Sequence, residues 1–136
     1  MAVTDKILRY SFAATLIGAT TAGMAGSASA RDITIGVIGP LSGPAANSGI
    51  SMRQAYEVAA EQVNKAGGIE IGGAKSKIKL IFEDSASRPE VGVSAAQKLL
   101  TRDNVDILVG DTIASSVTLA LMEVAPSFGK FMMSGQ

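Results

Sequence analysis

Several polar side chains follow short apolar runs in this sequence, where they could contact a small molecule. They are Ser42, the adjacent Glu83 and Asp84, the pair Ser115 and Ser116, and Ser134. Ser115 and Ser116 stand where a helix is expected to begin, and the free N–H groups of a helix N-terminus favour an anion. Hydroxyl groups beside such amides are suited to binding a carboxylate.

Each of these groups also has a plainer interpretation. Ser115 or Ser116 could simply cap the helix, and Asp84 could cap a loop. Glu83 and Asp84 are neighbours on a strand end and point to opposite sides, so they do not form an acid–base pair. The loop around Ser42 is rich in Gly and Pro and could be a shaped wall rather than a contact.

The composition argues against catalysis and against metal binding. The sequence contains no Cys and no His, which removes thiolate nucleophiles, the commonest general base and the commonest metal ligand. We therefore expect no enzyme, no cofactor and no metal site. The 12 basic and 12 acidic residues balance, so charge gives no reason to expect nucleic acid as a partner.

The spacing of apolar residues predicts strands that alternate with helices. Strands are expected at residues 33–38, 78–82, 106–109 and 131–133, and helices from Asn47 or Ser48 to about Ala66, from Pro89, and from Ser115 or Ser116 to Pro126. The inward face of the first helix is expected to carry Met52, Ala55, Ala59, Val63 and Ala66. This alternation predicts an α/β fold with a doubly wound parallel sheet, which binds ligands beyond the carboxyl ends of its strands.

The segment GGIEIGGAKS has a superficial likeness to a phosphate-binding loop. Ala74 separates Gly73 from Lys75, however, and a strand rather than a helix is expected to follow. The first strand–helix turn also lacks the GxGxxG pattern of dinucleotide sites. We expect Gly67 and Gly68 to stop the first helix, and a small hairpin or an extended turn at Gly72 and Gly73.

Residues 1–30 have the pattern of a signal peptide. A basic start contains Lys6 and Arg9, an apolar stretch of small residues runs from about Ser11 to Met24, and Ala28 and Ala30 form the A-x-A pattern of a cleavage site. We expect cleavage after Ala30 and release of a soluble chain into the periplasm. Since the sequence has no Cys to carry a lipid, a lipoprotein is not expected.

Four segments in order resemble the leucine/isoleucine/valine-binding protein family, which consists of type I periplasmic binding proteins that serve ABC importers. They are IGVIGPLSGPAANSG, NKAGGI, IKLIFEDSASRPEVGVSAAQKLL and VDILVGDTIASSVTLAL, within a likeness that covers nearly all of residues 33–134. The resemblance implies two α/β lobes that close around a small solute and then dock on a permease in the inner membrane. The implied solute is an amino acid of the branched-chain type, or a similar small carboxylate or amide.

The resemblance also implies which residues contact the solute. The family's Ser-rich turn after the third strand falls on Ala114, Ser115 and Ser116, where hydroxyls and helix amides hold a carboxylate. Ala114 stands where some relatives carry Ser, so one hydroxyl contact is expected to be lost. Further contacts fall on the turn that begins at Ser134, and Ser42 is a weaker candidate.

Members of that family are roughly two and a half times as long as this chain. We therefore expect residues 31–136 to form the N-terminal part of the first ligand-binding lobe, without the second lobe. Two other classes stay open. One is a ligand-sensing domain of the same fold in a receptor or regulator, and the other is an enzyme on a flavodoxin-like or Rossmann-like domain.

The signal-peptide hypothesis predicts that the exported protein begins at Arg31, because the A-x-A pattern ends at Ala30. N-terminal sequencing of protein recovered from the periplasm is the measurement. An exported protein that still begins with Met1 would contradict the prediction.

Overall fold

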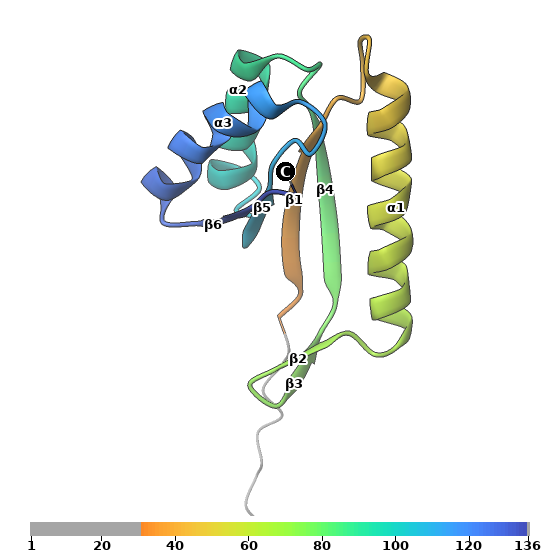
Figure 1. The fold of residues 1–136 in the computed structure, drawn as a ribbon. Coiled ribbons are helices and arrows are strands. Elements are labelled where there is room, and N and C mark those ends of the chain that lie inside the picture. Colours follow the sequence, from red (N-terminus) through yellow and green to blue (C-terminus); the bar gives the residue numbers. More distant parts are fainter. Residues whose placement is uncertain (1–30, 136) are drawn as a thin grey trace, which may run out of the picture.

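The computed structural model describes residues 31–135. Residues 1–30, which we predict to be a signal peptide, and Gln136 lie outside the described residues. The central feature is a 4-stranded parallel sheet with the order β4-β1-β5-β6 (Figure 1). Its strands are β1 (Ile33–Gly39), β4 (Ile78–Asp84), β5 (Ile107–Val109) and β6 (Phe131–Met133).

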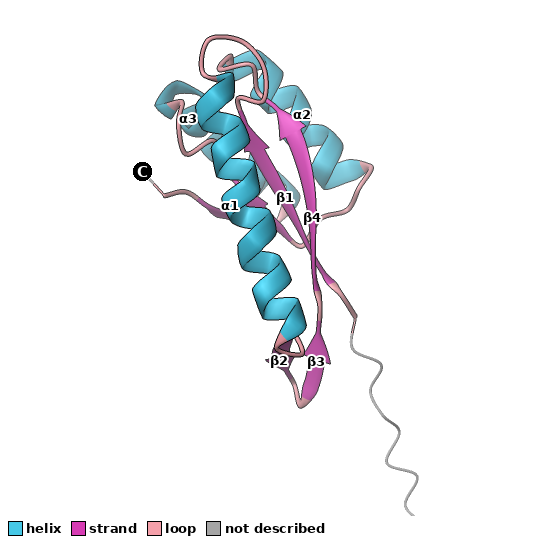
Figure 2. Ribbon diagram, turned by 90° about the vertical axis from the view of Figure 1, so that its right-hand side faces the viewer, coloured by secondary structure: helices cyan, strands magenta, loops and turns pink. Residues whose placement is uncertain are grey.

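Helices cover both faces of this sheet. They are α1 (Ala46–Lys65), α2 (Pro89–Thr101) and α3 (Ser115–Val124), and the short 3₁₀ helix η1 (Ala125–Phe128) follows α3. Helix α1 lies on one face, and α2 and α3 lie together on the other (Figures 1 and 2). The predicted doubly wound α/β fold is therefore confirmed. None of the helices in residues 31–135 is both long and apolar enough to cross a bilayer.

The strand order reverses at β1, and this reversal positions the loops. The chain leaves β1 through α1 and returns beside it as β4, then crosses β1 through α2 to form β5 on its other side. The loops that follow β1 and β5 consequently lead to helices on opposite faces of the sheet. In open parallel sheets this topological switch point opens a crevice beyond the carboxyl ends of the strands.

The main core lies between the sheet and the pair of helices α2 and α3. Ile38, Leu99, Leu108 and Leu121 are fully buried there. Helix α2 approaches β1 closely because Gly36 has no side chain, and a Cβ at that position would come within 2.9 Å of Leu99 Cδ1.

The inward face predicted for α1 is only partly correct. Met52 and Val63 are half-buried as expected, but Ala55, Ala59 and Ala66 are exposed. Gly49, Tyr56 and Ala60 complete the inward face instead. Alanine is compatible with either side of a helix, so its spacing did not reveal which side packs on the sheet.

The start of α1 also differs from the prediction. The helix begins at Ala46, with Ala45 in the N-cap position and no side-chain cap, so neither Asn47 nor Ser48 is the cap. The entry is instead a backbone turn in which the Ala46 N–H donates to the Gly43 carbonyl at 3.2 Å. Close packing fixes the first turn, because a Cβ on Gly49 would meet the Pro40 carbonyl oxygen at 2.0 Å.

The predicted turns after α1 are confirmed. Gly67 has the left-handed backbone conformation that ends many helices, with φ of 107°. The predicted hairpin is present as β2 (Ile69–Ile71) and β3 (Ala74–Ser76), which turns at Gly72 and Gly73. It lies at the amino ends of the long strands, far from the loops beyond their carboxyl ends (Figure 1).

Two shorter elements differ slightly from the prediction. The third strand of the main sheet, β5, starts at Ile107 rather than at Asp106, whose side chain bonds to β1 instead. Pro126 does not follow directly on α3, which ends at Val124, but lies inside η1. A proline lacks only its N–H and is tolerated in the first turn of a helix, so the chain continues for one 3₁₀ turn.

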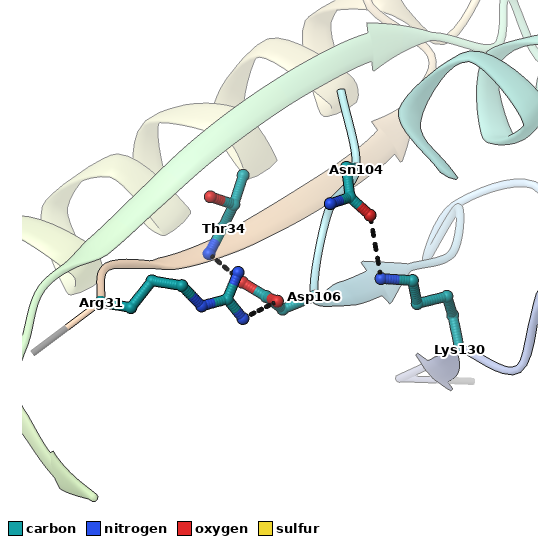
Figure 3. A network of polar contacts seen from close by, with 5 residues as sticks. All are labelled: Arg31, Thr34, Asn104, Asp106 and Lys130. Atoms are coloured by element: carbon teal, nitrogen blue, oxygen red, sulfur yellow. Dashed lines mark hydrogen bonds and ion pairs between the residues drawn. The ribbon is translucent and has the colours of Figure 1, made fainter. Parts of the chain in front are cut away.

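A polar network ties the start of β1 to the start of β5 (Figure 3). The Thr34 N–H donates to Asp106 Oδ2 at 2.9 Å, and the guanidinium group of Arg31 pairs with Asp106 Oδ1. The pKa of Asp106 is lowered, mainly by the Thr34 N–H against the opposing effect of partial burial, and further by Arg31 and more weakly by Lys130. Lys130 itself donates to Asn104 Oδ1 at 3.3 Å.

The lowered pKa of Asp106 gives a signed prediction for stability. A carboxyl group whose pKa is lower in the folded state stabilises the fold above its ordinary pKa of 3.8, and this contribution is lost as the pH falls through the lower folded value. Asp106→Asn should therefore lower the free energy of unfolding near neutral pH by about 1 kcal/mol.

Denaturant unfolding at a series of pH values measures this difference between the wild type and Asp106→Asn. The difference should begin to shrink as the pH falls below 3.8 and should approach zero once the pH is below the lower pKa of the folded state, because both proteins then carry an uncharged group at this position. Asp32→Asn, which changes an exposed acid next to the same strand, serves as the control. A difference between the wild type and Asp106→Asn that stays constant with pH would contradict the prediction.

Candidate functional site

The candidate site consists of loops at the carboxyl ends of β1, β5 and β6. Ser42 follows β1, Ala114 to Ser116 follow β5, and Ser134 follows β6. Because these strands are neighbours and parallel, the structure brings all the sequence-predicted site residues to the same edge of the sheet. Ser42, Ser115, Ser116 and Ser134 are exposed there, and Ala114 is half-buried.

Helix α3 begins at Ser115, as predicted, but neither serine caps it. Ala114 occupies the N-cap position, and its carbonyl accepts the N–H groups of Val117 at 3.0 Å and Thr118 at 3.2 Å. Within residues 31–135, the N–H groups of Ser115 and Ser116 donate to no backbone carbonyl outside α3. The plainer interpretation of these serines as N-caps is therefore wrong.

A buried acid holds the turn that leads into α3. Asp111 is 0 % exposed, and its Oδ1 accepts the N–H groups of Ile113 at 2.9 Å and Ala114 at 2.8 Å. Its Oδ2 accepts the hydroxyl of Ser85 at 2.5 Å, and its carbonyl accepts the hydroxyl of Thr118. Since Asp111 binds the amides before the helix, the hydroxyls of Ser115 and Ser116 are not needed to satisfy them.

Asp84, at the end of β4, organises the loop that contains Ser42. Its Oδ1 accepts the N–H groups of Leu41 at 2.8 Å, Ser42 at 3.1 Å and Ala86 at 2.8 Å. Burial raises the pKa of Asp84, but the side chain of Ser42 and these three N–H groups together lower it below its ordinary value. Asp84 is thus a loop-capping carboxylate, in agreement with the plainer of its two interpretations.

The turn between β4 and α2 has an unusual backbone. Ala86 and Ser87 both have positive φ, 48° and 58°, although neither is glycine. Such conformations cost energy and persist only where the surroundings enforce them. Here the surroundings include the Ser85 N–H, which donates to the Gly39 carbonyl at 2.9 Å, and the Ser87 N–H, which donates to Ser85 Oγ at 3.2 Å.

Thr112 lies between the two sides of the switch point and was not singled out from the sequence. Its hydroxyl lies 3.4 Å from the sulfur of Met52 on α1. Its methyl group lies 3.5 Å from the position that a Cβ on Gly135 would occupy, next to Ser134. Thr112 therefore lies close both to Met52 of α1 and to Gly135, which follows Ser134.

Ser134 also lines a hollow of about 420 Å³ beside β6, together with Met122, Ala125, Pro126, Lys130, Phe131 and Met132. Most of these residues belong to the C-terminal end of α3, to η1 and to β6. Met122 and Ala125, which line the hollow, lie about 9–15 Å along the helix axis from Ser115 and Ser116. Because the hollow is apolar and lies along an edge strand, we assign it to the uncovered edge rather than to the candidate site.

The arrangement of the acidic residues in the described part of the chain bears on metal binding. Within residues 31–135, no group of three or more His, Cys, Asp or Glu side chains could hold a metal ion. Glu83 pairs with Lys98 of α2, on the side away from the loop that Asp84 caps. The separation of Glu83 and Asp84 that the sequence predicted is confirmed.

The sequence contained one usable signal for Asp111. An aspartate can accept the N–H groups of the residues two and three positions after it in a turn, and Ile113 and Ala114 stand at these distances from Asp111. Its partner Ser85, however, is 26 residues away along the chain, and no local pattern connects the two.

The fold and these loops define a class of protein. A doubly wound parallel sheet with polar loops beyond its topological switch point is the arrangement of many small-molecule-binding domains. Within that class, the chain belongs to the periplasmic binding protein family, because the model for that family, described as "Periplasmic binding protein", matches residues 32–135.

Curated relatives agree with this membership. The chain is 40 % identical over 116 residues to Leu/Ile/Val-binding protein homolog 3 of Brucella melitensis, and the aligned region covers 85 % of this chain and 30 % of that protein. It is 37 % identical over 103 residues to Leu/Ile/Val-binding protein BraC3 of Rhizobium johnstonii, and the aligned region covers 76 % of this chain and 26 % of that protein. The chain therefore spans less than a third of the length of these relatives.

Solved structures of the family have the same fold. The branched-chain amino acid transporter substrate-binding protein LivJ of Streptococcus pneumoniae, in complex with isoleucine, matches with a TM-score of 0.67 and 28 % identity, over 76 % of this chain and 28 % of LivJ. A solute-binding protein of an ABC transporter from Rhodopseudomonas palustris, in complex with 3,4-dihydroxybenzoic acid, matches with a TM-score of 0.63 and 25 % identity, over 76 % of this chain and 26 % of that protein.

Proposed function

We propose that the chain is part of an extracytoplasmic solute-binding component of an ABC importer. In this role it binds an amino acid of the branched-chain type, or a similar small carboxylate, and delivers it to a permease in the inner membrane. The periplasm is the proposed location, reached by means of a cleaved signal peptide at residues 1–30. The names of the relatives support binding and transport rather than catalysis.

The observation that carries the proposal is that neither Ser115 nor Ser116 is used to cap α3. Their hydroxyls and first-turn amides lie beyond β5, next to the switch point, and Asp111 satisfies the turn in their place. The positive end of a helix and several converging donors favour an anion with oxygen acceptors. A single carboxylate is such an anion.

The solutes named for two solved relatives share this chemistry. Isoleucine and 3,4-dihydroxybenzoic acid differ in size, in shape and in their remaining polar groups, yet each has one carboxylate. A subsite that recognises the carboxylate alone is common to both. We propose that residues 114–116 provide this subsite, with Ser134 and Ser42 as further contacts, and that other parts of the protein select the rest of the solute.

The proposed function is tested by titration calorimetry on the protein produced from its own gene. L-isoleucine, L-leucine and L-valine should bind, and the amide of L-isoleucine, which lacks a carboxylate, should bind at least about tenfold more weakly. If the amide binds as tightly as the acid, the carboxylate subsite is ruled out.

The two serines are tested by the double variant Ser115→Ala and Ser116→Ala. Each lost hydrogen bond to a charged group is worth about 1.5–3 kcal/mol, so the affinity for L-isoleucine should fall about tenfold or more for each hydroxyl that contacts the solute. Ser94→Ala, which removes an exposed hydroxyl from α2, is the matched control and should leave affinity unchanged. Unchanged affinity in the double variant would exclude these serines from the site.

A further inference from the structure

We propose that Ser85 and Asp111 are positioning residues of the candidate site. Their buried hydrogen bond, together with the contacts of Asp84, holds the loops after β1 and β5 at a fixed spacing through the loop after β4, so that one solute can contact both Ser42 and residues 114–116. We call Asp84, Ser85 and Asp111 the loop bracket. This inference rests on the proposed function and deepens it, because it names the groups that set the geometry of the site.

The first half of the bracket joins the loop after β1 to the loop after β4. Asp84 Oδ1 accepts from the N–H groups of Leu41 and Ser42 on one side and of Ala86 on the other. In addition, the Gly39 carbonyl accepts the N–H groups of both Leu41, at 3.0 Å, and Ser85, at 2.9 Å. One carboxylate and one carbonyl thus fix the two loops against each other.

The second half joins the loop after β4 to the loop after β5. Ser85 and Asp111 are both 0 % exposed, and the Ser85 hydroxyl donates to Asp111 Oδ2 at 2.5 Å. Asp111 Oδ1 in turn accepts the N–H groups of Ile113 and Ala114, directly before Ser115. A chain of hydrogen bonds therefore runs from the Ser42 loop to the first turn of α3.

Burial makes these hydrogen bonds costly to break. A buried carboxylate that loses one partner suffers a desolvation penalty, because no water replaces the bond. The positions of Ser85, Ile113 and Ala114 are therefore tied to one another through Asp111. The Thr118 hydroxyl, which donates to the Asp111 carbonyl, attaches the same residue to the second turn of α3.

The strained turn at Ala86 and Ser87 fits this role. Two consecutive positive φ angles at non-glycine residues are unfavourable, and the Ser87 N–H is held by the same Ser85 hydroxyl that binds Asp111. The turn keeps this unfavourable conformation while the Ser85 side chain points into the protein interior and binds Asp111.

The test compares Ser85→Ala with a matched control in the protein produced from its own gene. Ser76→Ala is the control, because Ser76 is also buried, at 5 % exposed, but lies in the hairpin at the opposite end of the sheet. Three quantities are measured: the affinity for L-isoleucine well below the melting temperature, the hydrogen-exchange rates of the Ile113 and Ala114 amides without solute, and the melting temperature.

Ser85→Ala should weaken L-isoleucine binding about tenfold, a typical size for coupling between contacting loops. It should also speed the exchange of the Ile113 and Ala114 amides, whereas Ser76→Ala should change only the melting temperature. Asp111→Asn keeps an oxygen that can accept these amides and a nitrogen that can donate to Ser85, so its affinity should stay closer to that of the wild type than does the affinity of Ser85→Ala.

Two results would overturn the inference. Unchanged affinity in Ser85→Ala would reduce the bracket to a purely structural role even if the melting temperature falls. Unchanged exchange of the Ile113 and Ala114 amides would show that Ser85 does not hold the turn. If the wild type binds no solute, the proposed function fails, and the exchange rates still decide whether the bracket positions these loops.

Discussion

The burial of the Asp111 carboxylate is the constraint on which the loops of this domain depend. A carboxylate removed from water is tolerated only where hydrogen bonds replace its hydration, and Asp111 obtains them from Ser85, Ile113 and Ala114. Ser85 belongs to the loop after β4, whereas Ile113 and Ala114 belong to the loop after β5. Hydrogen bonds to one side chain therefore fix the position of one loop relative to the other. The helix that follows starts without a side-chain cap.

Much of the architecture could be predicted from the sequence, since strong local signals agree with the tertiary structure. The β-branched run at the start of β1, the glycines that end α1, and Pro89 at the start of α2 each permit few alternatives. Parallel strands separated by helices then require crossovers, and the crossovers place all carboxyl ends at one edge. The location of the candidate site at that edge was predictable for the same reason.

The errors and omissions involve residues with weak or distant signals. Ala55 and Ala59 have the spacing of a buried face but suit either environment, so only the packing of α1 on the sheet decides their exposure. The start of α1 follows from a backbone turn and the close approach of Gly49 to Pro40, which side-chain capping preferences do not describe. Asp111 resembles an ordinary loop acid until the fold brings Ser85 beside it.

The placement of β1 in the interior of the sheet has a consequence for how the chain acquires its structure. This strand is synthesised before all the others in the sheet, yet it must wait for Ile78 and then for Ile107 before it has a partner on each side. Pairings between residues so distant in sequence close slowly, because the entropy of the intervening chain is lost first. The strand at the beginning of the domain therefore waits longest for both of its partners, and its exposed N–H and C=O groups must stay hydrated until the chain as far as β5 is available.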